Sequence, residues 1–542
     1  MRGPSLVLTL LHAGLTAAAP TGAERLRLGE QIYREGRLPS GQPLRATRVS
    51  GEVSGADAAC VLCHRRSGMG SYEGNRLVPP VAGPYLFQPR ATTSAEMTDA
   101  RHTRGADLAH ALGRERPRPP YTEASLLAAI RDGQFAGGGE LDPLMPRYPL
   151  RSEEASLLVA YLRQLSSHQS PGVSTDTLQL ATVIAPGVDP VRRRALLDVL
   201  QNAVAVHNTA AKLERLRDRD SPGSSHARYR AWNLQVWELK GEPASWDGQL
   251  AAAYRRQPVF ALLSGLSEGE WGPVERFGER MGVPCWFPTV DLPPVEGNEF
   301  YSTYYTGGVG LEAAVLAQHL SRAPGLTRIL QVRGKGTAEE RAARGLGERL
   351  AGTPVPIEER PVGDAAAIRD ALSGLKPSDA VVLWLRSGEV AWLAQVPPPP
   401  GPVYLSSLLA GAEQVPLPPG WRRNARLVYP FELPERRRSN VTRFHSWLRT
   451  RNLALVDERV QAEAYLAVQL FSARVEDMLE ALYRDYLVER AESFVAERVS
   501  PVIFRGLTLG PGQRVASKGA YVVRFTATDG TALTAESEWI VP

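Results

Sequence analysis

The pattern of this 542-residue chain changes at about residue 178. From there to the C-terminus, short β-rich runs such as "LQLATVIAP", "DAVVLWLR" and "ARLVYPFEL" alternate with amphipathic helical stretches. Alternation of this kind is typical of parallel strands joined by crossover helices. It predicts an α/β fold for residues 178–542, within a chain long enough for two or three domains.

The residues before this point have a different character. Residues 24–167 hold several helical runs and few strand-like ones, and the polar stretch "SHQSPGVSTDT" predicts a linker over residues 168–177. At the N-terminus, Arg2, an apolar run and three alanines predict a signal peptide over residues 1–19, although Pro20 leaves the cut site open. No later segment approaches the roughly 20 apolar residues that span a membrane. We therefore expect an exported, periplasmic protein with no transmembrane segment in the mature chain.

Charge and cysteine content narrow the class of function. The formal net charge is +5, but the arginines are spread along the chain and do not alternate with aromatic residues in one patch. This distribution predicts ordinary solvated surface and no nucleic-acid partner. The three cysteines are too few for a disulfide framework, and Cys285, in the apolar run "VPCWFP", is expected to be a buried free thiol.

The stretch "DAACVLCHRRSGMG", residues 57–70, contains Cys60, Cys63 and His64 in a Cys-x-x-Cys-His pattern. A redox dithiol of the thioredoxin type would follow a strand, which "SGADAAC" does not resemble. A structural zinc site would need four ligands, and the sequence has no second cysteine pair nearby. The pattern therefore favours covalent attachment of a c-type haem, with thioether bonds to the cysteines and the imidazole on the iron.

A second iron ligand is expected downstream. Met145 lies in the Pro-rich segment "ELDPLMPRYP", before a helix for which Ser152 is the predicted N-cap. A methionine thioether opposite a histidine is a common ligand pair in electron carriers, so Met145 is the predicted distal ligand. Met69, His102 and His110 are the alternatives that the sequence leaves open.

With these motifs in order, residues 24–167 resemble a class I cytochrome c. "LRLGEQIYREG" matches the first helix, "NRLVPPVAGPYL" matches the segment that holds the proximal histidine, and the helix after Met145 matches the last one. The resemblance implies a mainly α cytochrome c domain with one haem c (iron) per chain. It also implies that the Pro80 carbonyl orients the His64 imidazole.

Residues 178–542 resemble a type I periplasmic binding protein, the fold of branched-chain amino-acid receptors. The resemblance implies two α/β lobes with a ligand cleft at the carboxyl ends of the strands. The candidate cleft residues are Ser264, Gly265, Ser267, Tyr304 and Tyr305. The nearby acids Glu268 and Glu270 disfavour a ligand carboxylate at the following helix and point to a neutral or cationic ligand, or to a cleft without function.

These resemblances together imply an exported monohaem cytochrome that transfers electrons and is not an enzyme. Its second domain would dock a partner or sense a small molecule. Its redox partners would be a donor dehydrogenase, such as a quinoprotein dehydrogenase, and an acceptor cytochrome or oxidase. The alternatives are a haem-containing ligand or redox sensor and a haem peroxidase.

Overall fold

The computed structural model describes residues 21–73, 76–89, 118–218, 229–294, 299–492, 499–528 and 530–542. The predicted signal peptide and the histidines His102 and His110 lie outside these residues. The chain divides into two units, Met1–His168 and Gln169–Pro542, which we call unit 1 and unit 2. Within the described residues, no helix is long and apolar enough to cross a membrane.

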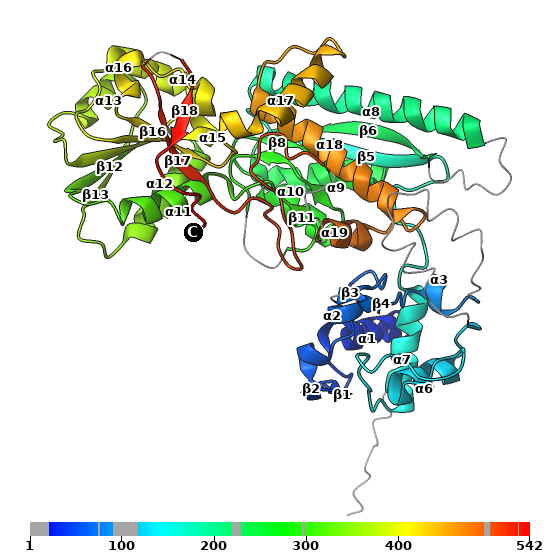
Figure 1. Ribbon diagram of the computed structural model, residues 1–542. Coiled ribbons are helices and arrows are strands. Elements are labelled where there is room, and N and C mark those ends of the chain that lie inside the picture. The colour runs from blue at the N-terminus through cyan, green and yellow to red at the C-terminus, as the bar shows by residue number, and fades with distance from the viewer. Residues whose placement is uncertain are drawn as a thin grey trace, which may run out of the picture. The chain divides into compact units, whose positions relative to one another are not determined.

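Unit 1 is mainly helical (Figure 1). Its described helices are α1 (Gly22–Glu35), α2 (Val61–His64), α3 (Gly83–Leu86), α6 (Glu123–Asp132) and α7 (Ser152–Gln164). Two antiparallel strand pairs accompany them: β1 (Arg45–Arg48) with β2 (Gly51–Ser54), and β3 (Ser71–Glu73) with β4 (Arg76–Val78). The core lies between α1, α6 and α7 and includes Ile32, Leu126 and Leu158.

The helix ends in unit 1 follow local sequence signals. Thr122 and Ser125 form a capping box at the start of α6, and Gly133 ends that helix in the left-handed conformation. The predicted N-cap of α7 is wrong by one residue. Ser152 is the first helical residue and Arg151 is the cap, because the Glu154 carboxylate accepts a hydrogen bond from the Arg151 N–H at 2.9 Å.

Helices α1 and α7 pack closely at Gly29. A Cβ atom at this position would lie 2.2 Å from the Leu157 carbonyl oxygen and 2.7 Å from the Tyr161 Cβ. We expect Gly29→Ala to force the helices apart and to lower the stability of unit 1 by about 1–3 kcal/mol. Scanning calorimetry of the full chain measures this change. Gly22→Ala is the control, because a Cβ at Gly22 meets nothing within 4 Å; equal loss in both variants would contradict the packing argument.

Unit 2 contains two α/β lobes, each built on a sheet (Figure 1). Lobe 1 contains β5–β11, and every pair in its sheet is parallel. The strands are β5 (Thr177–Ile184), β6 (Ala231–Glu238), β7 (Ala261–Leu263), β8 (Leu266–Ser267), β9 (Cys285–Trp286), β10 (Thr289–Val290) and β11 (Ser302–Thr303). Its helices are α8 (Pro190–Asp218), α9 (Trp246–Arg256), α10 (Gly272–Met281), α18 (Glu458–Met478) and α19 (Arg484–Glu492).

Lobe 2 has the strand order β13-β12-β14-β15-β16-β17-β18. The first five strands are parallel, and β17 and β18 are antiparallel. The strands are β12 (Arg328–Arg333), β13 (Ile357–Pro361), β14 (Asp379–Trp384), β15 (Val403–Ser406), β16 (Ala425–Tyr429), β17 (Tyr521–Phe525) and β18 (Leu533–Ala535). The helices are α11 (Gly308–Leu320), α12 (Thr337–Leu350), α13 (Ala365–Ala371), α14 (Ser387–Val390), α15 (Ser407–Ala410) and α16 (Pro419–Arg422). α17 (Pro434–Arg449) packs on α18 through Phe444 and Tyr465.

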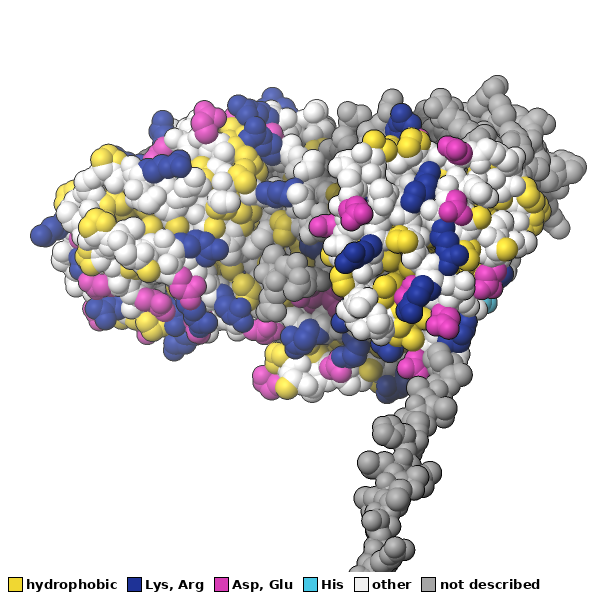
Figure 2. Space-filling view, turned by 90° about the horizontal axis from the view of Figure 1, so that it is seen from below, with side chains coloured by type: hydrophobic (Ala, Val, Ile, Leu, Met, Phe, Trp, Pro, Cys, Tyr) yellow, Lys and Arg dark blue, Asp and Glu magenta, His cyan; other side chains and the backbone are white. Residues whose placement is uncertain are grey.

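Two features of the sequence analysis reappear in unit 2. Every residue of β14 is buried, as expected for a central strand covered on both faces. On the face of the whole chain drawn in Figure 2, which includes both units, Lys and Arg side chains lie interspersed with Asp and Glu. The α/β fold predicted from the alternation of strands and helices is confirmed for unit 2.

Candidate functional site

Polar side chains gather where strands of the two lobes end. Glu268 follows β8, Asp291 follows β10, and Arg386 follows β14 just before α14. The carboxyl ends of parallel strands form the edge at which open α/β sheets bind their ligands. Because Glu268 and Asp291 belong to lobe 1 and Arg386 to lobe 2, their contacts join the two lobes.

Asp291 is the centre of this group. The side chain is fully buried, and Arg459 Nη1 lies 2.8 Å from its Oδ1. Arg386 Nη1 lies 3.0 Å from Oδ2 and Arg192 Nη1 lies 3.9 Å from the same oxygen. Burial alone would raise the pKa of Asp291, but the positive charges of Arg459, Arg192 and Arg386 outweigh it and hold the pKa below its usual value. The carboxylate is therefore ionised and joins α8, α18 and lobe 2.

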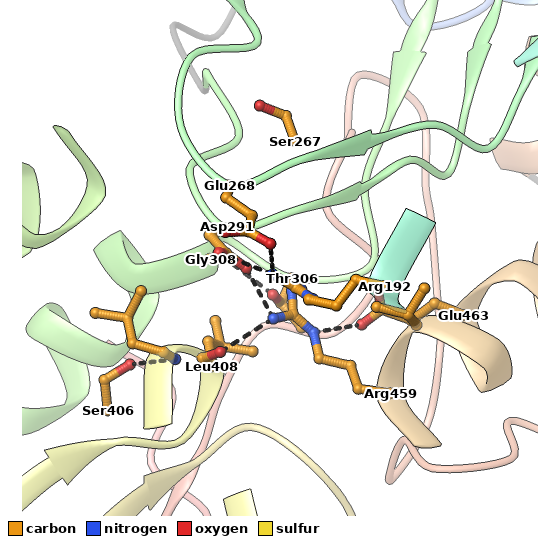
Figure 3. Close-up of polar contacts among 12 residues, drawn as sticks. Arg192, Ser267, Glu268, Asp291, Thr306, Gly308, Ser406, Leu408, Arg459 and Glu463 are labelled. Atoms are coloured by element: carbon orange, nitrogen blue, oxygen red, sulfur yellow. Dashed lines mark hydrogen bonds and ion pairs between the residues drawn. The ribbon is translucent and has the colours of Figure 1, made fainter. Parts of the chain in front are cut away.

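Further carboxylates surround the arginines. Arg192 pairs with Glu268 at 2.7 Å and with Asp457 at 3.3 Å, and Arg459 pairs with Glu463 at 3.1 Å. Figure 3 shows the Arg459 side chain between Asp291 and Glu463, where it also donates to the Leu408 carbonyl of lobe 2 at 3.3 Å. We call this group the Asp291 cluster. Its members are Arg192, Glu268, Asp291, Glu339, Arg386, Asp457, Arg459 and Glu463.

Arg386 reaches from lobe 2 into this cluster. Its Nε lies 2.7 Å from Glu339 Oε1 within lobe 2, and its Nη2 donates to the Glu268 carbonyl oxygen of lobe 1 at 2.6 Å. Together with the bond to Asp291, these contacts engage three nitrogens of one guanidinium. The side chain holds the two strand-end regions together in this structure.

The loop predicted to bind a ligand is adjacent to the cluster, but its serines are not part of it. The Ser267 hydroxyl donates to the Glu270 carbonyl at 2.8 Å, and Ser267 lies apart from the ion pairs in Figure 3. Ser264 is buried, and its hydroxyl has no hydrogen-bond partner among the described residues. Gly265 has a φ of +142°, and a Cβ there would lie 2.6 Å from the Trp271 ring, so the position requires glycine. The loop contributes Glu268 to the cluster.

The predicted cleft residues Tyr304 and Tyr305 have buried side chains that contact other parts of unit 2. Both are buried in the segment that connects β11 to α11. The Tyr304 hydroxyl donates to Glu275, and the Tyr305 hydroxyl donates to the Glu463 carbonyl at 2.7 Å. The Tyr305 ring stacks on Phe504, with 5.1 Å between ring centroids. The two tyrosines therefore lie packed where the chain passes from lobe 1 to lobe 2.

Sequence reasoning missed Asp291, Arg192, Arg386 and Arg459. Arg386 had the clearest signal, because it lies two residues after a strand that is apolar except for Asp379. Asp291 follows β10, a strand of only two residues that a sequence pattern does not reveal. Arg192 and Arg459 are helix residues, and their meeting with Asp291 depends on how distant helices pack.

A second buried carboxylate lies in lobe 2. Glu312 of α11 accepts a hydrogen bond from the Leu408 N–H at 3.1 Å with Oε1 and from the Ser406 hydroxyl with Oε2. It therefore satisfies a donor at the start of α15. Burial, only partly offset by these bonds, raises the pKa of Glu312 to about 8.

This raised pKa gives a pH-dependent stability. The folded chain keeps the Glu312 proton at pH values where the unfolded chain, with an ordinary pKa of 4.5, has lost it. The stabilisation is fully present below about 4.5 and is lost as the pH rises through about 8. We expect wild type to lose stability relative to Glu312→Gln over this window, as measured by urea unfolding. Glu340→Gln, on the exposed face of α12, is the control, and parallel curves for wild type and Glu312→Gln would contradict the assignment.

In unit 1, the structure fixes the His64 ring through a neighbouring carbonyl. His64 is buried, and its Nδ1 lies 3.0 Å from the Pro79 carbonyl oxygen. The resemblance implied that the Pro80 carbonyl orients the imidazole, but the carbonyl in contact belongs to the preceding residue, Pro79. The backbone at Val78 and Pro79 lies so close to Gly70 that a Cβ there would be 2.1 Å from the Val78 oxygen. This close approach brings the Pro79 carbonyl to the imidazole.

The other predicted residues of unit 1 lie around the same core. Cys60 precedes α2 and packs with Met145 against the core of unit 1, and both side chains are partly buried. Burial raises the pKa of the Cys60 thiol to about 12. Cys63 lies on α2, and Met69, the neighbouring alternative, is buried.

Comparisons with known proteins identify the fold of unit 2. No family model matches the chain, and no curated protein matches it significantly. Among solved structures, a branched-chain amino-acid ABC transporter protein from Thermus thermophilus with bound valine has a TM-score of 0.50 and 11% identity, and the match covers 68% of this chain and 98% of that one. A fatty-acid ABC transporter substrate-binding protein from Thermomonospora curvata has a TM-score of 0.49 and 14% identity, covering 69% and 95%. These shares are close to the part of the chain that unit 2 occupies.

Unit 2 therefore has the two-lobed α/β fold of type I periplasmic binding proteins. This confirms the resemblance drawn for residues 178–542 at the level of fold. No comparison shows a cytochrome c domain for the residues before it.

The predicted electron carrier is contradicted by these findings. The Thermus thermophilus structure that shares this fold is an ABC transporter protein with bound valine, and the described residues hold no group of three or more His, Cys, Asp or Glu side chains placed for a metal ion. The prediction of a covalent haem c with its iron is therefore wrong. The predicted redox partners, namely a donor dehydrogenase of a quinoprotein chain and an acceptor cytochrome or oxidase, are wrong for the same reason. The alternative functions, a haem sensor and a haem peroxidase, are wrong as well.

Proposed function

We propose that the chain is an exported solute-binding protein that holds a small polar molecule between the two lobes of unit 2. The observation that carries this proposal is the Asp291 cluster, which places charged groups from both lobes at the carboxyl ends of their strands. The type I fold supports it, because a protein of this fold from Thermus thermophilus carries bound valine. Burial of the cluster gives strong, directional contacts to a solute enclosed there.

The fold supplies a means of opening the site. The chain passes from lobe 1 to lobe 2 after β11, returns after β16, and passes again between α19 and β17. The Phe504 ring joins these connections, because Tyr305 stacks on it and Phe431 contacts it at a tilt. Rotation about this hinge would separate Arg386 from Asp291 and admit a solute. We propose a membrane transporter as the partner that receives the solute, and the periplasm as the location.

A thermal-shift screen tests this proposal. All ten tryptophans lie between residues 232 and 539, so their fluorescence reports the unfolding of unit 2. We expect one chemical class among amino acids, fatty acids, polyamines and dicarboxylates to raise the midpoint in proportion to log concentration. The rise should shrink in Glu268→Gln and persist in the control Glu238→Gln, whose exposed pair with Arg193 lies outside the cluster. A panel without effect would contradict the proposal, as would equal shifts in both variants.

We also propose that residues 24–167 form a separate domain with the helix arrangement of class I cytochromes c. The crossing of α1 and α7 at Gly29 and the bond from His64 to a proline carbonyl support this arrangement. Cys60, Cys63, His64 and Met145 remain the candidate binding residues of this domain, with no bound group assigned to them. Residues 168–177 would join it to unit 2.

Intact mass spectrometry of the exported chain tests the role of these cysteines. If they hold a group covalently, the masses of wild type and Cys60→Ala/Cys63→Ala will differ by more than the mass of two sulfur atoms. Cys285→Ala is the control, because Cys285 is buried in lobe 1. A mass difference accounted for by sulfur alone would reject covalent binding at Cys60 and Cys63.

A further inference from the structure

The contacts of Arg386 define a set of acceptor atoms on lobe 1. Its guanidinium lies 3.0 Å from Asp291 Oδ2, 2.6 Å from the Glu268 carbonyl oxygen and 3.5 Å from Glu268 Oε2. These three atoms only accept hydrogen bonds, and two of them belong to carboxylates. The lobe 1 surface that faces Arg386 is therefore matched to a planar cation with several N–H donors.

The other charges around this surface leave it negative. Lobe 1 contributes the arginines Arg192 and Arg459. It also contributes four carboxylates, those of Glu268, Asp291, Asp457 and Glu463, so the acidic groups outnumber the basic ones. Arg192 is engaged with Glu268 and Asp457, and Arg459 with Asp291 and Glu463. Burial raises the pKa of Glu463, which Arg459 opposes, and Asp291 remains ionised beside its arginines. Removal of Arg386 would leave the Asp291 Oδ2 without its nearest cation.

A second observation points to a missing donor at the same place. Glu339 Oε1 pairs with Arg386, but its Oε2 is buried and has no hydrogen-bond partner among the described residues. The whole Glu339 residue is only 1% exposed. A buried carboxylate oxygen without a donor is costly, and an N–H of a ligand in the place of the Arg386 guanidinium would supply one.

We infer that the site between the lobes selects a cationic solute, a guanidinium or primary ammonium compound, which takes the place of the Arg386 guanidinium between Asp291 and Glu268. This inference rests on the proposed solute-binding function and names the class of its ligand. In the absence of the solute, Arg386 fills the acceptor set and holds the lobes closed. The side chain is 26% exposed and lies at the start of the short helix α14, so it can withdraw without disturbing a strand.

Calorimetric titration of the full chain tests the inference. The probes are agmatine and L-arginine as cations, L-valine as an amino acid with an apolar side chain, and glutarate as an anion. We expect Arg386→Met, which removes the internal competitor, to bind the cations about tenfold more tightly than wild type. Arg386→Lys should give a smaller gain. Arg426→Met is the matched control, because Arg426 is 24% exposed and pairs with Glu536 on lobe 2.

The outcomes separate the two proposals. If valine or glutarate binds and neither cation does, the cationic class is overturned and the solute-binding function stands. If the cations bind wild type and Arg386→Met equally, replacement of Arg386 is overturned. If no probe binds any variant, the inference fails, and the wider thermal-shift panel decides the function. Urea unfolding shows whether Arg386→Met is folded, and Arg386→Lys carries the test if it is not.

Discussion

Replacement of Asp291 by alanine is expected to lower the free energy of unfolding of unit 2 by about 3–5 kcal/mol. The carboxylate is fully buried and accepts from Arg459 at 2.8 Å and from Arg386 at 3.0 Å. Without it, the Arg459 guanidinium, which is 15% exposed, loses one of its charge partners in a poorly solvated place. The cost is large because Arg459 and Arg386 both lose a buried, hydrogen-bonded acceptor in a poorly solvated place. Urea unfolding followed by tryptophan fluorescence measures it in the full chain.

The matched control for this change is Asp247→Ala. Asp247 pairs with Arg280 at 2.5 Å, but both side chains are about half exposed, at 52% and 50%. Ion pairs of this kind contribute roughly 0–1 kcal/mol, so we expect little change. If Asp291→Ala cost no more than Asp247→Ala, the Asp291 cluster would not be the electrostatic centre of unit 2.

Replacement of Arg484 by methionine is expected to destabilise unit 2 by at least about 3 kcal/mol. This buried side chain of α19 donates to the carbonyl oxygens of Val259 at 2.5 Å, Phe260 at 3.1 Å and Pro171 at 3.1 Å, and to the Tyr254 hydroxyl at 2.9 Å. Longer bonds reach Met281 and Gly282. Methionine fills much of the volume but leaves these acceptors unpaired, so tryptophan fluorescence should report unfolding at lower urea.

A second readout follows from the Pro171 contact. Pro171 lies in the predicted linker, where Ser170 also accepts from the Arg484 N–H. We expect limited proteolysis near residues 168–174 to become faster in Arg484→Met and to stay slow in Arg449→Met, whose exposed guanidinium donates to Ser446. Unchanged stability and unchanged cleavage in Arg484→Met would show that α19 does not fix this segment.

The fold of unit 2 could be predicted because its signal is repeated along the chain. Apolar runs such as "DAVVLWLR" are buried on both faces in a parallel sheet, and helical stretches such as Gly308–Leu320 lie between them. Very short strands such as Thr289–Val290 give no such signal, so the position of Asp291 stayed hidden. Within the predicted linker 168–177, Ser170 and Pro171 accept hydrogen bonds from Arg484 of lobe 1, contacts that the linker composition does not reveal.

The candidate site could be predicted only in part. The loop around Glu268 was found because it joins a strand to a helix, but the serines in it were preferred to the acid. The sequence did not indicate the burial of Tyr304 and Tyr305, because an aromatic pair after a strand has the same pattern whether it lines a cleft or packs inside the protein. Arg192, Arg386 and Arg459 are far apart in sequence, and only tertiary packing brings them to one carboxylate.

In unit 1, the Cys-x-x-Cys-His pattern led to the prediction of an electron carrier, which the comparisons contradict. The structure places Cys60 just before α2 and Cys63 and His64 within it. The carbonyl that contacts His64 is that of Pro79, one residue before the predicted Pro80. A short motif specifies the residues at a site but does not specify what the whole chain does. The fold of the larger unit carries the functional conclusion instead.

Hydrogen exchange of the full chain, followed by mass spectrometry, tests the central claim most directly. The exchange is measured with and without the solute that gives the largest thermal shift. Our account predicts slower exchange in the strand-end segments 264–270, 289–293, 386–390 and 405–410, which carry or adjoin the Asp291 cluster, because an enclosed solute holds the lobes together. Protection confined to unit 1, or to parts of unit 2 away from these segments, would contradict a solute site between the lobes.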